Sequence, residues 1–392
     1  MEEERRMILN MIRDGKITAE EGEKLLKALG QESDASGPQP SKGENEETGV
    51  TEATSSNREL STDVNWEQAN RRFEEEKEAF GQSSDGDRGW QAGAKWLSDF
   101  VDDVMRKVKE MDLDFNFGQA ELVQHTFQHA NVTEGSIDIA VENGSIEVVP
   151  VDTGSLSLVC DAHVYQRSAE KEARSFFLEN TIFEQDGERL RFHSKAKNVK
   201  LHAKLYLPVK SYEQFYLYTL NGHLKADRLQ AASLNIKAVN GSITLTEPSA
   251  SVCYAETVNG PIEIGHARLE QLDVRTVNGA ITTSGRLNDL EAETLHGALD
   301  VSLLNVPRAR AKLSAATGNV DVKVSEELRI NGHLQTNVGN YHISLPLVNV
   351  TNETKNFWQR TASFTANENQ SAPLYLEAET KTGIISVNPL RT

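Results

Sequence analysis

Four acidic residues, spaced through a repeated part of this 392-residue chain, are its best candidates for hydrolytic chemistry. Glycoside hydrolysis needs two carboxylates that flank the scissile bond across a cleft. Glu256, Glu263, Asp273 and Glu291 could supply such a pair. They are scattered among Lys and Thr and are not clustered with aromatic residues, a pattern typical of a solvated face. We therefore predict no catalytic residues and no enzyme, with a polysaccharide-active lyase or hydrolase as the alternative.

Metal and nucleophile motifs are equally sparse. His125 and His129 stand four residues apart and could share a metal ion on a helix, but no third ligand of the HExxH kind follows. The chain has no Gly-rich phosphate loop, no GxSxG elbow and no CxxC pair. Its two cysteines, Cys160 and Cys253, stand in strand-like apolar settings, which favours buried free thiols over a disulfide. We expect no metal site and no cofactor.

The elements that would position these residues are set by a repeat. Asn-Gly recurs at 221–222, 240–241, 259–260 and 278–279, and weaker copies follow at Gly297, Gly318 and Gly339. The glycines are 19, 19, 19, 18, 21 and 21 residues apart. A fixed period near 20 indicates a stacked repeat. Further copies surround Gly144 and Gly383. The Asn row at 221, 240, 259 and 278 resembles a ligand row, but we expect stacked corner asparagines that hydrogen-bond one another.

Apolar residues alternate on both sides of each glycine. The site two residues after it holds Leu224, Ile243, Ile262, Ile281, Leu299 and Val320, and the site five before it is equally apolar. The site three before it is Ala or Thr. This period of two predicts strand, turn, strand. Antiparallel hairpins are one solution, because Asn-Gly is a strong hairpin signal. We favour a β-solenoid, since a ladder of equivalent corners explains recurrence of one residue class at one offset.

The segments VNGSITL (239–245), VNGPIEI (258–264) and VNGAITT (277–283) resemble the bacterial “putative adhesin” family of β-strand-repeat proteins. That resemblance implies a single-stranded, right-handed β-helix without catalytic residues. GKITAEEGEKLLKAL (15–29) resembles a short SHOCT-type helical domain. The combination is similar to a Firmicute group that includes daptomycin-sensing surface proteins, which implies a role in envelope stress or surface interaction.

Composition limits the partners and the compartment. The net charge is −18, and an acidic chain without a basic stripe is a poor match for nucleic acid or anionic lipid. No apolar run reaches the ~18–20 residues of a membrane span, and the acidic start MEEERRMILNMIRDG does not resemble a signal peptide. We therefore expect a cytoplasmic protein, possible contact with a membrane surface, and, as the alternative, a cell-surface location by an unrecognised export route.

Three zones precede the β-repeat body at 116–392. Residues 1–30 are predicted to form a helical hairpin, with a capping box at Thr18 and Glu21 and an apolar face suited to a partner, a second copy or its own chain. Residues 31–62 contain almost no large apolar side chain and are predicted to be a disordered linker. Residues 63–115 are predicted to be an amphipathic helical segment. Within the body, we expect a helix and a strand pair at 166–192 and a polar loop with Phe357 and Trp358 at 351–372.

The seam at 88–111 is the main candidate contact site. Its apolar residues follow heptad a and d positions and are Trp90, Ala94, Leu97, Val101, Val104, Val108 and Met111. Trp96, Phe100 and Met105 widen that face. Three interpretations are open: a cap over the first coil of the solenoid, self-association or partner binding, and insertion at a membrane surface. Trp90, Trp96, Leu97, Phe100 and Val101 are the predicted partner or membrane contacts.

These patterns together predict a mainly β, non-enzymatic interaction or scaffold protein. Its solenoid is the binding face, and its helical head recruits a protein partner or a second copy in an envelope-stress or adhesion context.

Overall fold

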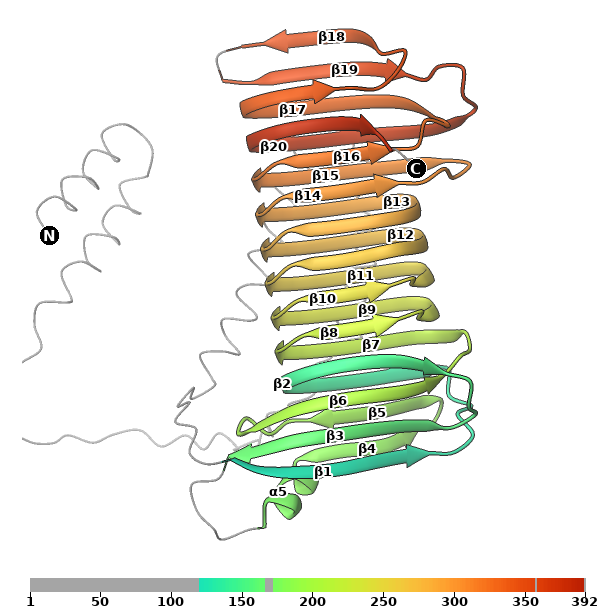
Figure 1. Cartoon of the computed structure of the whole chain (residues 1–392), viewed down its shortest axis with the longest axis vertical. Helices are drawn as coiled ribbons and strands as arrows, with labels where there is room; N and C mark the ends of the chain where they lie inside the picture. The colour runs from blue at the N-terminus through green and yellow to red at the C-terminus, as the bar shows by residue number, and fades with distance from the viewer. Residues whose placement is uncertain (1–119, 166–171, 357, 391–392) are drawn as a thin grey trace, which may run out of the picture. The chain divides into compact units, whose positions relative to one another are not determined.

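A stack of parallel coils makes up most of the structure, a computed structural model that describes residues 120–165, 172–356 and 358–390 (Figure 1). The described residues hold twenty strands, joined in one sheet, and the single short helix α5. The helical hairpin, the linker and the 88–111 seam, with Trp90, Trp96, Leu97, Phe100 and Val101, lie outside these residues.

Each central coil has a long strand, an Asn-Gly corner, a short strand and a second corner. The long-strand layer contains β7 (Tyr212–Asn221), β9 (Gln230–Asn240), β11 (Ser249–Asn259) and β15 (Ala309–Thr317). The short-strand layer contains β8 (Leu224–Asp227), β10 (Ile243–Thr246), β14 (Leu299–Leu303) and β16 (Val320–Val324). β12 (Ile262–Asn278) and β13 (Ile281–His296) run through the second corner and serve both layers.

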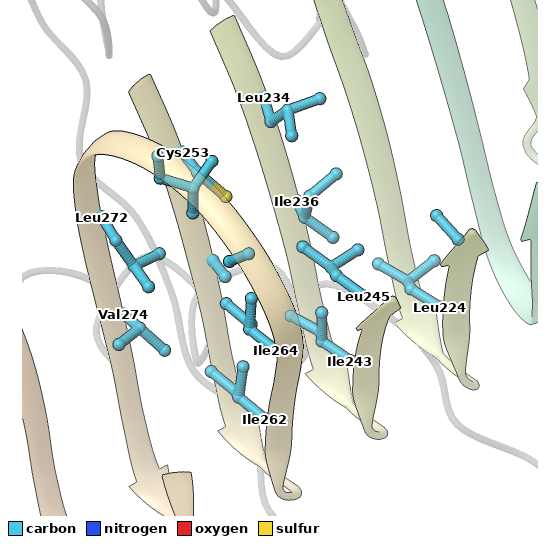
Figure 2. Packing of buried hydrophobic residues seen from close by; sticks show 14 of the residues in the cluster. Leu224, Leu234, Ile236, Ile243, Leu245, Cys253, Ile262, Ile264, Leu272 and Val274 are labelled. Carbon is cyan, nitrogen blue, oxygen red and sulfur yellow. The ribbon is translucent and has the colours of Figure 1, made fainter. Parts of the chain in front are cut away.

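The register confirms the solenoid-like stack over the hairpin alternative for these repeats. Ile243 pairs in parallel with Leu224 on one side and Ile262 on the other, and Ile262 pairs with Ile281. All four side chains are buried at no more than 1% exposure. Figure 2 shows Leu224, Ile243 and Ile262 among the interior apolar residues. The expected single-stranded β-helix needs one correction: each coil carries two strand segments, and the segments join into one continuous sheet.

The Asn-Gly corners stack as predicted. The Nδ2 of Asn240 donates to Oδ1 of Asn221 at 2.8 Å, and the same bond links Asn259 to Asn240 and Asn278 to Asn259. The Ala-or-Thr site also has a physical reason, because a buried threonine hydroxyl there donates to a corner carbonyl. Thr257 Oγ1, for example, lies 2.9 Å from the carbonyl oxygen of Gly241.

The second corner is formed by a different residue type in each coil, so it has no sequence signature. It falls six residues after the glycine, at Arg228, Glu247 and His266, all of which have φ near +50°. In the next coil Gly285 takes this place with φ +147°. A corner held by backbone hydrogen bonds, such as Glu247 N to Gly265 O at 2.8 Å, tolerates different side chains.

The N-terminal end of the stack departs from the repeat. It comprises β1 (Ala120–His129), β2 (Ser136–Val151), β3 (Leu156–Tyr165), α5 (Ala173–Glu179), β4 (Thr181–Asp186), β5 (Arg189–Ser194) and β6 (Val199–Pro208). The helix and strand pair predicted at 166–192 are confirmed as α5, β4 and β5. α5 contacts β1, β3 and β4 and buries Ala173 and Phe177, so it covers this end of the core.

The C-terminal end contains β17 (Leu328–Ile343), β18 (Asn349–Lys355), β19 (Arg360–Ala366) and β20 (Ala372–Pro389). β20 lies between β15 and β17 and pairs in parallel with both, so the last strand in sequence is not the last in space. The prediction of a polar loop at 351–372 was wrong. This segment includes the end of β18 and all of β19, which pair in antiparallel fashion, and Trp358 between them is 75% exposed.

Candidate functional site

The outer surface of the long-strand layer carries an apolar row. Side chains alternate along a strand, so the residue just before each corner Asn points away from the core. We call Leu220, Val239, Val258 and Val277 the outer stripe. Leu220, Val239 and Val258 form a cluster separate from the main core, and Tyr218 and Val277 pack against it. These three are only 5%, 4% and 9% exposed. By contrast, the outward residues Lys225, Glu263 and Thr282 of the short-strand layer are exposed.

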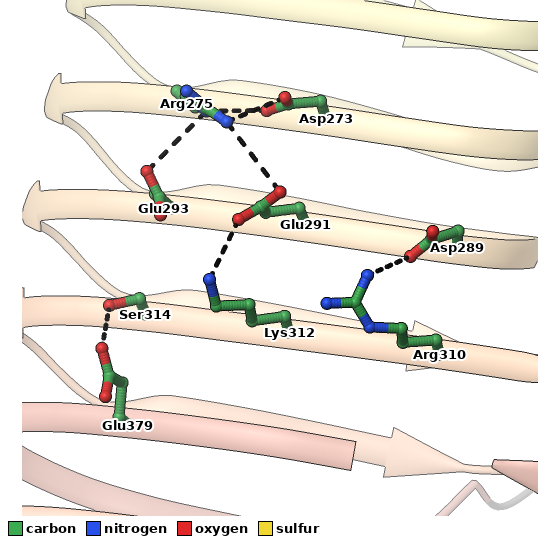
Figure 3. Close-up of polar contacts among 9 residues, drawn as sticks. All are labelled: Asp273, Arg275, Asp289, Glu291, Glu293, Arg310, Lys312, Ser314 and Glu379. Atoms are coloured by element: carbon green, nitrogen blue, oxygen red, sulfur yellow. Dashed lines mark hydrogen bonds and ion pairs between the residues drawn. The ribbon is translucent and has the colours of Figure 1, made fainter. Parts of the chain in front are cut away.

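Beside the stripe runs a set of charged side chains that we call the charged ladder: Lys237, Glu256, Asp273, Arg275, Glu291, Glu293 and Lys312. Arg275 is its centre (Figure 3). The guanidinium donates to both oxygens of Asp273, with Nε–Oδ1 at 2.8 Å and Nη2–Oδ2 at 2.9 Å. It also lies 3.7 Å from Glu293 and 3.9 Å from Glu291 on the next strand.

Lysines extend the ladder in both directions. Lys237 contacts Glu256 at 2.8 Å, and Lys312 contacts Glu291 at 3.3 Å. The outlying pair of Asp289 and Arg310, at 3.5 Å, is about half exposed at both ends and contributes little to stability. The ladder therefore holds four carboxylates for three cations.

Burial shifts the pKa values of several groups in the charged ladder. Desolvation, assisted by Glu291, Glu256 and Glu293 and opposed by Arg275, raises the pKa of Asp273 to about 7. Burial likewise raises the pKa of Glu293, against the attraction of Arg275. Burial alone would lower the pKa of Arg275, but its acidic neighbours raise it, so the guanidinium stays charged.

The interpretation of these acids as a solvated face was therefore wrong for two of the four. Glu256 and Asp273 are 7% and 6% exposed, and Glu291 is partly exposed within the ladder. Glu263 lies on the short-strand layer and is exposed. The ladder brings Glu256, Asp273 and Glu291 together, pairs them with cations and adds Glu293, which the sequence had not singled out.

We expect the ladder to give the protein a measurable pH dependence. Because the pKa of Asp273 is raised from 3.8 to about 7 in the folded state, the fold binds this proton more tightly than the unfolded chain. Stability from this group is therefore fully present below about pH 4 and falls as the pH rises towards 7. The free energy of unfolding of Asp273→Asn, relative to that of wild type, should therefore increase by on the order of 2 kcal/mol between pH 5 and pH 8. Urea titrations at each pH measure this difference.

Asp289→Asn is the matched control, since Asp289 lies on the same face but in an exposed pair. Its stability difference from wild type should not change with pH. A difference for Asp273→Asn that is constant with pH, or that favours wild type at high pH, would contradict the assignment.

The two histidine candidates contact charged side chains and do not form a metal site with each other. His125 and His129 lie on strand β1, not on the helix that a shared metal would need. His129 Nε2 is 2.8 Å from the buried carboxylate of Glu134, and His125 Nδ1 is 3.2 Å from Arg174. In the part of the chain that the structure describes, no group of three or more His, Cys, Asp or Glu is arranged to hold a metal ion.

Both cysteines are free and buried, as predicted. Burial raises the pKa of each thiol to about 12, which keeps them protonated and unreactive.

The outer stripe was not predicted, although its signal is present in the sequence. The residue before each Asn is apolar at a position where the alternation requires an outward side chain. Apolar residues on an outward face mark a contact surface when they form a continuous patch.

Comparison with known proteins gives two family matches. Residues 164–370 match the Toastrack DUF4097 family, and residues 3–34 match a SHOCT-like domain. The chain is 31% identical over 387 residues, 99% of both chains, to a Bacillus subtilis protein named “Uncharacterized protein YvlB”.

Two solved structures from Parabacteroides distasonis are more distant. One is described as a “putative adhesin” (12% identity, 69% of this chain and 98% of that one, TM-score 0.41). The other is described as a “Putative lipid binding protein” (12% identity, 68% and 97%, TM-score 0.39). In the described residues, no helix has the length and apolar character needed to cross a bilayer.

Proposed function

The chain belongs to the Toastrack DUF4097 family, and from that premise we propose that it is a non-enzymatic interaction protein of the bacterial cell envelope. In this proposal the solenoid supplies a contact surface, and the SHOCT-like head at residues 3–34 recruits a protein partner or a second copy. Its stimulus is envelope stress, as the resemblance to the daptomycin-sensing group implies. We also propose that the coils wind in the right-handed sense that parallel crossover connections adopt.

One observation carries the proposal, namely the outer face of the long strands. The interior columns alone close the core, since Ile243, Ile262 and Ile281 are fully buried there. The outer stripe and the charged ladder are additional to that core. Apolar side chains next to paired charges form the kind of surface that recognises another polypeptide element, with the apolar part supplying affinity and the charges supplying register.

The enzymatic alternative would use the ladder itself. Two carboxylates with different pKa values are what a glycosidase needs, and Asp273 differs from an ordinary carboxylate in this respect. Both oxygens of Asp273, however, accept hydrogen bonds from Arg275, and Glu291 is shared between Arg275 and Lys312. These contacts favour a structural role, so we assign the ladder to the contact surface.

Cell fractionation tests the proposal. Cells are exposed to a membrane-active lipopeptide antibiotic, and the protein is quantified in soluble, membrane and surface fractions before and after exposure. We expect its amount at the membrane to rise at least threefold. Leu25→Asp with Leu26→Asp, in the apolar positions of the head, should prevent this, whereas Lys27→Ala should not. Unchanged amount and location after stress would overturn the proposal.

A further inference from the structure

We propose that the outer stripe is the docking surface for residues 88–111 of the same chain. The inference deepens the proposed function, because it names the segment that occupies the contact surface proposed above, and it rests on that proposal. It joins an apolar row on the body that is shielded from solvent to an apolar seam in the sequence that follows heptad spacing.

The shielding of the stripe is the first observation. An outward side chain in the middle of an uncovered sheet face keeps much of its surface, as Lys225 and Glu263 do on the short-strand layer. Leu220, Val239 and Val258 point outwards as well, yet each retains less than a tenth of its surface. Tyr218 and Val277 pack against them, and a continuous apolar row of this kind is suited to an apolar occupant that runs along the coils.

The repeat distances match. A helix rises ~1.5 Å per residue, so one heptad of the 88–111 seam spans ~10.5 Å. Adjacent strands lie ~4.8 Å apart, so two coils of the stripe span ~9.6 Å. The average spacing between successive a and d residues of the seam is therefore nearly equal to the spacing between successive residues of the outer stripe. Twenty-four residues give a helix of ~36 Å, long enough to cover seven strand spacings.

The chain enters the body at the edge of the sheet that carries the Asn-Gly corners. Ala120 pairs with Tyr165, and the neighbouring Val164 pairs with Val199, at the start of β6. Two residues into β6, Leu201 pairs with the corner Gly144. β1 thus begins on the Asn-Gly edge, where the stripe runs immediately before each Asn (Figure 1).

The distance to be bridged is short. β1, β3, β6, β2 and β8 are successive neighbours, so the level of β8 is four strand spacings, ~19 Å, from β1. The eight residues 112–119 span up to ~28 Å when extended. Residue 111 can therefore reach Leu220, which precedes the corner between β7 and β8.

The alternative role of residues 88–111, a cap over the first coil, is already taken by another element. α5 covers the N-terminal end of the core with Ala173 and Phe177, the position that an end cap would take. Charge is complementary at one position. Lys107 occupies a heptad g position beside the seam, and the charged ladder next to the stripe has one carboxylate more than it has cations.

Disulfide trapping in the full-length protein tests the docking. Val101→Cys is combined in turn with Val239→Cys, Val258→Cys or Val277→Cys, and the protein is oxidised at micromolar concentration. The native cysteines are fully buried and do not interfere. At least one pair should form an intramolecular disulfide in more than half of the molecules. Val101→Cys with Glu263→Cys, on the exposed short-strand layer, is the control and should form few.

Hydrogen exchange gives an independent measurement. Val258→Asp should raise amide exchange in residues 88–111 at least tenfold, while the strands of the body keep their protection. Disulfides only between molecules would show that a second copy occupies the stripe and would overturn the proposal. So would the absence of any disulfide together with unchanged exchange. Failure of the fractionation experiment would leave these outcomes unaffected.

Discussion

Ile262→Asp is expected to abolish the cooperative folding of the body. Ile262 is fully buried and stands in a column between Ile243 and Ile281. An aspartate there would either bury an unpaired charge or protonate and still lack hydrogen-bond partners, and such changes cost more than ~4 kcal/mol. That is comparable with the whole stability of many domains. Thermal melting by circular dichroism, with soluble yield as a second measurement, should show no transition near that of wild type.

Glu263→Ala is the matched control, one residue along the same strand and exposed. Its stability should lie within ~0.5 kcal/mol of wild type. A melting temperature of Ile262→Asp within a few degrees of wild type would refute the column.

Gly241→Ala is expected to destabilise the body strongly although it adds a single methyl group. A Cβ at Gly241 would lie 1.6 Å from the carbonyl oxygen of Gly222 and 2.5 Å from its carbonyl carbon. The corner backbone would have to move, and with it the Asn221–Asn240–Asn259 hydrogen bonds. We expect a loss of about 3 kcal/mol or more in urea unfolding.

Gly265→Ala is the control in the same region. No atom lies within 4 Å of its added Cβ, so the substitution should be neutral or slightly stabilising, because alanine restricts the unfolded chain. Equal losses for the two variants would show that corner packing is not what requires glycine at 241.

The coils were predictable because their interior is periodic. Side chains at a fixed offset from each glycine stack on their own kind, as Ile243, Ile262 and Ile281 do, and such order is visible in one sequence. The second corner was not predictable, because its geometry depends on backbone conformation at Arg228, Glu247 and His266, which share no chemistry.

The spatial order of β17 and β20 in the stack was not predictable for a different reason. β17 and β20 carry the same corner pattern around Gly339 and Gly383, and nothing in either segment specifies which one follows β15. The choice is made by long-range pairing, together with the antiparallel partner β19 on the far side of β17.

The contact surface was only partly predictable. Glu256, Asp273 and Glu291 were recognised as outward acids, which is correct, but their pairing requires strands 16 to 21 residues apart in sequence to lie side by side. The stripe residue Val258 was readable from the alternation, since an apolar residue stood where a polar one was expected. The seam containing Leu97 and Val101 lies outside the described residues and stays a prediction.

The placement of β20 has a consequence for biosynthesis. The central coils can add one to another as the nascent chain leaves the ribosome, but the edges of β15 and β16 have no permanent neighbour until β20 has been translated. The roughly 60 residues from the start of β17 to the end of β20 take about 3–12 s to synthesise. During that interval an unpaired parallel edge is exposed, and β17 could occupy it prematurely. Chaperone dependence and the yield of correctly folded protein should therefore be governed by this late insertion and not by the repeats that precede it.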